Sequence, residues 1–161
     1  MPVMKVVSIV GEKNSGKTTL IEELIARLRD YGSVGCVKHA QELALDESKD
    51  TTRLFNAGAE LVIGSSEHVT LKLSRSKGDS LREQLKDMAA SGMDFVLVEG
   101  FKSSDLPKIA IEPLPDGDER VISNVVMRLS GDPKSHINEI VRLIREIEDY
   151  NYECERWETE E

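Results

Sequence analysis

Eight residues at the end of the first apolar segment constrain the fold of this chain more than any other feature. They read Gly11-Glu12-Lys13-Asn14-Ser15-Gly16-Lys17-Thr18 and fit the spacing G-x-x-x-x-G-K-[ST]. The preceding run, Val3–Val10, is short, rich in β-branched residues and mostly apolar, which predicts a buried parallel strand. The following run repeats apolar residues at helical spacing until Gly32 ends it. This order of strand, glycine-rich loop and helix predicts an α/β fold that begins with a phosphate-binding loop.

Each fixed position of the loop has a physical task at a phosphate group. The glycines let backbone N–H groups turn toward phosphate oxygens, and the positive end of the helix dipole strengthens the attraction. Lys17 can reach the outer phosphates, and the hydroxyl of Thr18 can bind the Mg²⁺ ion that bridges them. The alternative is an ordinary strand-to-helix turn that contains glycine. We predict a nucleotide site whose phosphates contact Gly11, Glu12, Lys13, Asn14, Ser15, Gly16, Lys17, Thr18 and Thr19.

A second apolar strand, predicted over residues 93–98, ends in an acidic residue. Ligands of open α/β sheets lie beyond the carboxyl ends of the strands. Glu99 stands at that end beside Gly100, whereas Asp94 begins the strand and is expected to be structural. We assign catalysis to Lys17 and Glu99 and magnesium binding to Thr18 and Glu99. The alternative for Glu99 is a solvated carboxylate at a strand end.

Strands and helices alternate along the rest of the chain. Ser80-Leu81-Arg82-Glu83 has the form of a capping box and opens a helix, and Asp132-Pro133 begins the last one. We predict a short helix over 50–57, a hairpin of strands 61–63 and 69–73, a strand over 33–39, and edge strands over 108–112 and 120–126. The fold class is therefore a three-layer α/β/α fold of the P-loop NTPase type, with a largely parallel sheet and extra short antiparallel strands.

Composition excludes several classes of partner. The chain has 161 residues and a net charge of −9, which disfavours nucleic-acid polymers and anionic membranes, because both attract clustered positive charge. Between Glu139 and Glu161 nine acidic residues face three arginines, so this part carries −6 and the rest only −3. We expect one nucleotide-binding domain over residues 1–150 and an acidic tail over 151–161, in which Trp157 is free to contact a partner.

The cysteines and the apolar runs suggest a compartment. Cys36 and Cys154 are far apart and match neither a metal pair nor a disulfide framework. The start of the chain has no signal-peptide pattern, and no apolar run reaches about 20 residues. We expect a soluble cytoplasmic protein that does not contact a membrane.

The order of short motifs along the chain resembles the MobB family, the molybdopterin-guanine dinucleotide biosynthesis protein B. The resemblance extends from about Val3 to Glu112. Two positions depart from the family pattern, because Gln41-Glu42 stands where a further histidine is frequent and Ser48 stands where glycine is usual. The motifs are Gly11–Leu20, Val37-Lys38-His39, Asp46, Lys49-Asp50-Thr51 with Arg53, Ala57-Gly58-Ala59, Val98-Glu99-Gly100-Phe101-Lys102 and Pro107-Lys108-Ile109.

The resemblance implies a P-loop domain that forms a homodimer, binds GTP with Mg²⁺ and hydrolyses it weakly if at all. It also implies a partner, the guanylyltransferase that joins GMP to molybdopterin to form the dinucleotide cofactor of molybdenum or tungsten. Molybdopterin is a possible further ligand. The preference for GTP over ATP rests on the resemblance alone, since no N-K-x-D sequence is present and only the amide of Asn124 is placed to contact a base.

The residues of the later motifs allow two interpretations each. Lys38 and His39 either contact a phosphate of the nucleotide or pterin, or are solvated at a strand end. The next loop, with both charge signs, either moves to sense the γ-phosphate or clamp an anionic ligand, or has a structural role in which Asp50 caps the short helix and pairs with Arg53. For Lys102 and Lys108 we favour a functional role, because both are expected to bring positive charge close to the phosphate loop. We include as ligand-binding candidates Lys38, His39, Asp46, Lys49, Asp50, Arg53 and Lys102.

Two other classes of protein use the same loop. A small-molecule kinase needs a basic lid over the phosphates, and Arg75, Lys77 and Arg82 form the basic cluster suited to that role. A GTPase that delivers a metal needs a His-rich tract or paired cysteines, and His68 and His136 have no second ligand nearby in the sequence. Both remain alternatives to the accessory role in cofactor synthesis.

Overall fold

The computed structural model describes residues 3–75 and 80–151, which form two compact units. The first unit combines Met1–His39 with Ser80–Glu161, and the second is Ala40–Asp79. The sequence pattern predicts a single domain over residues 1–150 and does not reveal that the second unit is inserted within it. The acidic tail, with Cys154 and Trp157, lies outside the described residues apart from Asn151.

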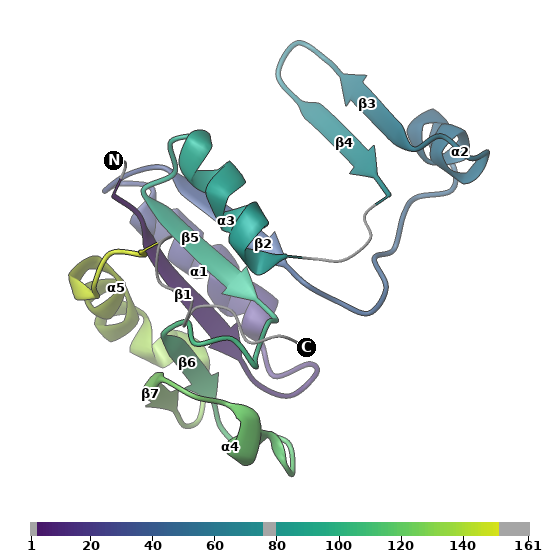
Figure 1. Cartoon of the computed structure of the whole chain (residues 1–161). Helices are drawn as coiled ribbons and strands as arrows, with labels where there is room; N and C mark the ends of the chain where they lie inside the picture. Colours follow the sequence, from purple (N-terminus) through teal and green to yellow (C-terminus); the bar gives the residue numbers. More distant parts are fainter. Residues whose placement is uncertain (1–2, 76–79, 152–161) are drawn as a thin grey trace. The chain divides into compact units, whose positions relative to one another are not determined.

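A parallel sheet forms the centre of the first unit (Figure 1). The strand order is β2-β5-β1-β6-β7, and every neighbouring pair is parallel. Mostly apolar strands suit such a sheet, because helices cover both of its faces. The strands are β1 (Lys5–Val10), β2 (Val34–Lys38), β5 (Phe95–Glu99), β6 (Lys108–Ile111) and β7 (Val125–Leu129).

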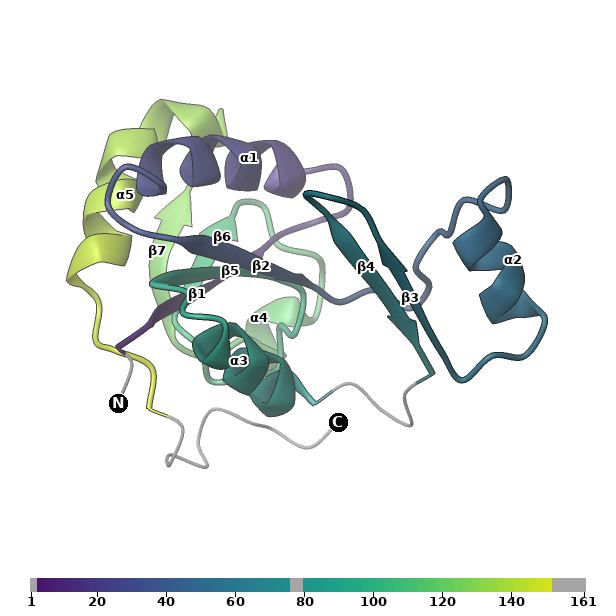
Figure 2. The same ribbon diagram turned by 90° about the horizontal axis from the view of Figure 1, so that it is seen from above.

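Helices pack on both faces of this sheet, as Figure 2 shows. One face is covered by α1 (Lys17–Leu28) and α5 (Ile137–Glu146), which bury Leu20, Leu24, Ile140 and Ile144 against the strands. The opposite face is covered by α3 (Leu81–Ala90), where Leu81, Leu85 and Ala89 pack against Val96 and Val98. This arrangement confirms the predicted three-layer fold with its parallel sheet.

Local capping signals also agree with the structure. The Ser80 side chain accepts a hydrogen bond from the Glu83 backbone N–H at 3.3 Å, which is the predicted capping interaction. Asp132 accepts from the Lys134 N–H at 3.1 Å and begins the 3₁₀ helix η1 (Pro133–His136), which leads into α5. Asp94 accepts from the Ser33 N–H at 2.7 Å, so its predicted structural role is confirmed.

The predicted edge strands need two corrections. Residues 108–112 supply β6, which is not an edge strand, since it lies between β1 and β7. The prediction of a strand over 120–126 is wrong, because α4 (Asp118–Val121) occupies its start and the edge strand β7 begins only at Val125. Gly117 and Asn124 adopt positive φ angles of 90° and 57° on either side of α4, and such reversals do not continue an extended strand.

The second unit is a helix followed by a hairpin. It comprises α2 (Asp50–Asn56), β3 (Leu61–Ser65) and β4 (Thr70–Ser74), and the two strands pair antiparallel. The predicted hairpin is thus confirmed. Val62 is buried, whereas Leu61 and Ile63 on the other face of β3 are 51% and 62% exposed. In the described part of the chain no helix is long and apolar enough to span a membrane.

The sequence predicts that Lys108 brings positive charge toward the phosphate loop. The structure shows that it does not. Its side chain is fully buried, and its ammonium donates to the carbonyls of Ser104, Leu106 and Ser123. Burial lowers its pKa to about 8, against a partial opposing effect of Asp105. Lys108 therefore holds together the loops that precede β6 and β7.

We expect the free energy of unfolding of the wild type to rise between pH 8 and pH 10 relative to Lys108→Met. The unfolded lysine has the ordinary pKa of 10.5 and the folded one about 8, so in this interval the unfolded state binds more protons and rising pH favours folding. Below pH 8 the lysine is charged in both states and its burial cost is complete. The gain is at most roughly 3 kcal/mol.

Urea denaturation of both proteins across this pH range measures the difference. Lys86→Met on the exposed side of α3 is the matched control, for which a flat difference from wild type is expected. If the difference in free energy of unfolding between wild type and Lys108→Met does not change with pH, burial of the Lys108 ammonium does not make stability depend on pH.

Candidate functional site

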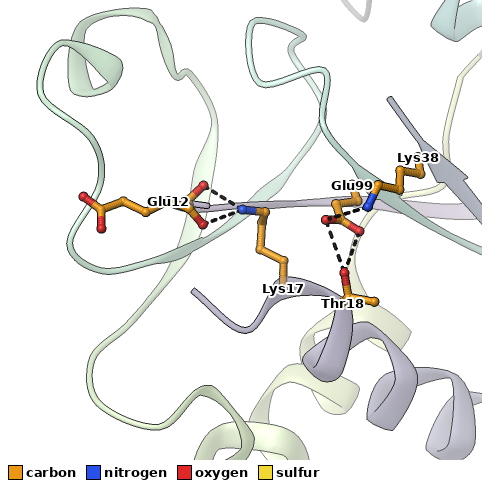
Figure 3. A network of polar contacts seen from close by, with 6 residues as sticks. Glu12, Lys17, Thr18, Lys38 and Glu99 are labelled. Atoms are coloured by element: carbon orange, nitrogen blue, oxygen red, sulfur yellow. Dashed lines mark hydrogen bonds and ion pairs between the residues drawn. The ribbon is translucent and has the colours of Figure 1, made fainter. Parts of the chain in front are cut away.

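The loop between β1 and α1 has the backbone geometry that its glycines predict. Asn14 and Gly16 have φ angles of 61° and 92°, and Gly16 is the residue before the first turn of α1. Lys17 Nζ donates to the carbonyl of Gly11 at 2.9 Å and to that of Glu12 at 2.6 Å, so its side chain folds back over the loop (Figure 3). The loop is therefore a closed turn at the positive end of the helix dipole.

Ser15 lies inside this turn with an unused hydrogen-bonding group. Its hydroxyl oxygen is buried, and no group in the described parts of the chain forms a hydrogen bond with it. A side-chain Cβ at position 11 would lie 2.8 Å from that oxygen, so only glycine leaves room for it. A buried unsatisfied hydroxyl is costly. The hydroxyl and the positive helix end both fit a loop that takes up an anion with several oxygens, such as a phosphate group.

Thr18, Glu99 and Lys38 meet beside the loop, from three separate elements (Figure 3). Thr18 Oγ1 lies 3.3 and 3.4 Å from the two carboxylate oxygens of Glu99, and Lys38 Nζ lies 3.7 Å from Glu99 Oε1. The Glu99 side chain is 14% exposed, whereas that of Lys38 is 56% exposed. A hydroxyl and a carboxylate in contact are oxygen ligands of the kind that Mg²⁺ prefers alongside phosphate oxygens.

The electrostatics of the site centre on Lys17. Partial burial lowers the pKa of its ammonium, Glu99 opposes this effect, and the charges of Lys38 and Lys102 add to it. Two further cations thus act on the lysine of the loop. A site in which ammonium groups repel one another favours an anionic ligand with several charges.

The turn after β5 is held in place by contacts with two neighbouring strands. Gly100 has a φ of 105°, and a Cβ there would lie 2.9 Å from both Cβ and the carbonyl oxygen of His39. The Ser8 hydroxyl donates to the Gly100 carbonyl at 3.1 Å. The rings of His39 and Phe101 stack with centroids 4.4 Å apart. These contacts position Glu99 beside the loop.

His39 and Lys102 have partners other than the phosphate loop. The backbone N–H of His39 donates to the carbonyl of Glu99 at 2.8 Å, in addition to its ring contact. Lys102 Nζ lies 2.9 Å from Asp118 Oδ1. Its charge nevertheless contributes to the lowered pKa of Lys17. Asn124, proposed as a base contact, donates its amide to the Asp105 carbonyl at 2.9 Å and serves the loop before β6 instead.

The remaining predicted ligand residues belong to the second unit. Asp46 accepts hydrogen bonds from the N–H and hydroxyl of Ser48, which lower its pKa. Asp50 does not cap α2, because Lys49 precedes the helix without a side-chain cap, but it pairs with Arg53 at 3.7 Å on the surface. A role of Asp46, Lys49, Asp50 and Arg53 in ligand binding stays a prediction.

Sequence reasoning missed two residues that shape the site. Ser8 is a single polar residue within a run of apolar ones, and this interruption of the strand was the available signal. Asp118 has no such signal, since it stands in an acidic turn among other carboxylates. Of the basic cluster considered for a lid, Arg75 lies 4.0 Å over the Phe55 ring in the second unit, and Lys77 is outside the described residues.

Taken together, the sheet order and the glycine loop between β1 and α1 define a P-loop NTPase-type α/β protein. Over residues 6–126 the chain matches the family described as molybdopterin guanine dinucleotide synthesis protein B, MobB. A relative from Haemophilus influenzae named molybdopterin-guanine dinucleotide biosynthesis adapter protein is 34% identical over 125 residues, covering 71% of this chain and 70% of the relative. The chain therefore belongs to the MobB family.

Other comparisons agree with this assignment. An Escherichia coli protein of the same name is 30% identical over 145 residues, covering 83% of this chain and 82% of that protein. A Methanocaldococcus jannaschii relative is 30% identical over 149 residues, and the match covers 89% of this chain but only 62% of that relative's length. The crystal structure of Bacillus subtilis MobB superposes with a TM-score of 0.70 at 22% identity, covering 89% of this chain and 100% of that one. This last likeness concerns the fold.

Gly100→Ala is expected to lower the free energy of unfolding by roughly 2–4 kcal/mol. About 1–2 kcal/mol comes from an L residue at positive φ, and the rest from the contact of the new Cβ with His39. Gly92→Ala is the matched control, because Gly92 also has a positive φ of 78° but its Cβ would meet nothing within 4 Å. Urea denaturation measures the loss of unfolding free energy in both variants. Equal losses would show that a Cβ at position 100 does not clash with His39.

Proposed function

We propose that this protein is a GTP-binding adapter in the synthesis of the molybdopterin guanine dinucleotide cofactor. The observation that carries the proposal is the closed glycine loop, with its buried free hydroxyl, beside the Thr18–Glu99 pair. The relatives from Haemophilus influenzae and Escherichia coli are both named as adapter proteins of this synthesis. The proposed partner is the guanylyltransferase that attaches GMP to molybdopterin, and the proposed compartment is the cytoplasm.

Different residues of the proposed site bind different parts of Mg²⁺-GTP. Backbone N–H groups of residues 11–18 and the Ser15 hydroxyl receive the phosphates, and Lys17 and Lys38 balance their charge. Thr18 and Glu99 hold the magnesium ion, which would neutralise phosphate charge. Glu99 is already shared between Thr18 and Lys38, which suits a carboxylate that holds a cation better than one that activates water. Weak hydrolysis at most is therefore part of the proposal.

Binding without rapid turnover suits an adapter. A protein that holds GTP in a defined position can present it, or molybdopterin, to an enzyme that performs the transfer. Lys38 is more than half exposed, so it is available to a phosphate of the pterin as well as to the nucleotide. Molybdopterin is for this reason proposed as a further ligand.

We also propose that the protein is a homodimer joined through the hairpin of the second unit. A two-stranded sheet is marginally stable by itself. On β3 the side chains of Leu61 and Ile63 are exposed, and Val69 and Leu71 of the same hairpin are 67% and 46% exposed. Leu71 pairs with Gly64 and so lies on the opposite face of the hairpin from Leu61 and Ile63. Both faces therefore expose apolar side chains, and exposed apolar surface marks interaction sites. A second copy of this hairpin offers the same apolar residues and two further strand edges.

Lys17→Ala is expected to weaken GTP binding at least 100-fold, because it removes the cation nearest the phosphates. Isothermal titration calorimetry with GTP, ATP and GDP in the presence of Mg²⁺ measures the affinities. Wild-type protein is expected to bind GTP more tightly than ATP. Lys134→Ala in η1 is the control and should bind as the wild type does. An unchanged affinity of Lys17→Ala would show that the nucleotide binds elsewhere.

Size-exclusion chromatography with light scattering tests both proposed associations. The chain alone is expected to have the mass of a dimer, and Leu61→Asp with Ile63→Asp is expected to give a monomer, because charges desolvated at an interface are costly. Glu67→Gln at the hairpin turn is the control. A monomeric wild type would contradict the proposed dimer.

The same measurement tests the proposed partner. Added guanylyltransferase is expected to shift the elution peak of the protein to a larger mass. An unshifted peak would contradict the proposed partner.

A further inference from the structure

One cation of the site is held by a carboxylate from α4. Lys102 follows the turn after β5, and its Nζ lies 2.9 and 3.1 Å from the two carboxylate oxygens of Asp118. The Asp118 side chain is 16% exposed, whereas that of Lys102 is 54% exposed. A sheltered carboxylate that accepts from one ammonium with both oxygens limits where that ammonium can move.

Asp118 is itself on a well-anchored segment. The next residue, Glu119, binds the guanidinium of Arg128 with both oxygens, at 3.0 and 3.2 Å, and Glu112 binds the same guanidinium at 2.8 Å. These carboxylates raise the pKa of Arg128 further above its usual range. The ion pairs attach α4 to β7 and to the end of β6. Asp118 thus has a fixed base from which to orient Lys102.

Lys102 is tied to the phosphate loop by its place in the chain. It follows Glu99 by three residues, and the carboxylate of Glu99 contacts Thr18 at the start of α1. The charge of Lys102 also helps to lower the pKa of Lys17. Lys102 is therefore the member of the ion pair that we assign to the site, and Asp118 contacts the site through it. A lysine side chain has many rotamers, and ordering it opposes binding. A cation that is already ordered before the ligand arrives avoids part of that loss.

We propose that Asp118 is a positioning residue of the site, which holds Lys102 in place for the polyphosphate of the ligand. This inference rests on the proposed function, since it concerns the same site. The opposite effect is physically possible, because a carboxylate that only competed with phosphate for Lys102 would weaken binding. The two roles predict affinity changes of opposite sign when Asp118 loses its charge.

Affinities of Asp118 and Lys102 variants for Mg²⁺-GTP and for inorganic tripolyphosphate test the inference. Lys102→Met is expected to weaken binding about 10-fold and Asp118→Asn about 3-fold to 5-fold, because the lysine stays but is no longer ordered. The double variant should bind no more weakly than Lys102→Met alone, since Asp118 acts through Lys102. Asp118→Glu should recover most of the wild-type affinity, which a merely structural loss would not allow.

Asp116→Asn is the matched control for the change of charge. Asp116 lies in the same turn two residues earlier, is exposed, and forms no side-chain hydrogen bond or ion pair with the described residues. Its variant is expected to bind as tightly as the wild type or slightly more tightly. Thermal denaturation of every variant reports whether it is folded.

Two results would overturn the inference. Tighter binding by Asp118→Asn would show that Asp118 competes with the ligand, and additive losses in the double variant would show that it acts independently of Lys102. Failure of wild-type protein to bind GTP would instead contradict the proposed function. The tripolyphosphate measurements would still decide the role of Asp118, because that probe needs no base recognition.

Discussion

The parallel register of β5 between β2 and β1 is the constraint on which the site depends. Glu99 is level with Ile9 of β1 on one side and with Lys38 of β2 on the other. This alignment brings the end of β5 next to Gly11, where the glycine loop begins. A slip by one residue would turn the Glu99 side chain to the other face of the sheet. The contact between Glu99 and Thr18 at the start of α1 would then be lost.

Gly100 lets the strands stay close together beyond the end of β5. Parallel strands separate there, and side chains usually fill the space between them. Because position 100 has no Cβ, the backbone of His39 comes within reach of the turn, and the Ser8 hydroxyl ties the same turn to β1. The three strands therefore stay together one residue beyond their ladder. The backbone of Glu99 is thus fixed at the end of β5, and its carboxylate is held by Thr18 and Lys38.

The sequence predicts those parts of the protein whose signals are local. Strand β1, the loop, the cap at Ser80 and the hairpin each follow from residues that are neighbours in the chain. The position of Lys108 depends on three carbonyls, two from the loop before it and one from Ser123. Its charge alone led to the prediction that it serves the phosphate loop. The short helix α4 depends on two positive φ angles that the sequence of an acidic turn does not reveal. Neither the carbonyls around a buried ammonium nor a positive φ at Asn124 follows from residue type alone.

The charge arrangement is compatible with the anion site that we propose in this acidic chain. The net charge is −9, yet Lys38 is paired with Glu99 and Lys102 with Asp118, while Lys17 is bound to backbone carbonyls. Each ammonium is thus partly balanced, which limits the repulsion among the three. Since Lys38 and Lys102 remain more than half exposed, both can still reach a ligand. Carboxylates used in this way order the ammonium groups before a ligand arrives, which reduces the entropy lost when the proposed polyphosphate binds.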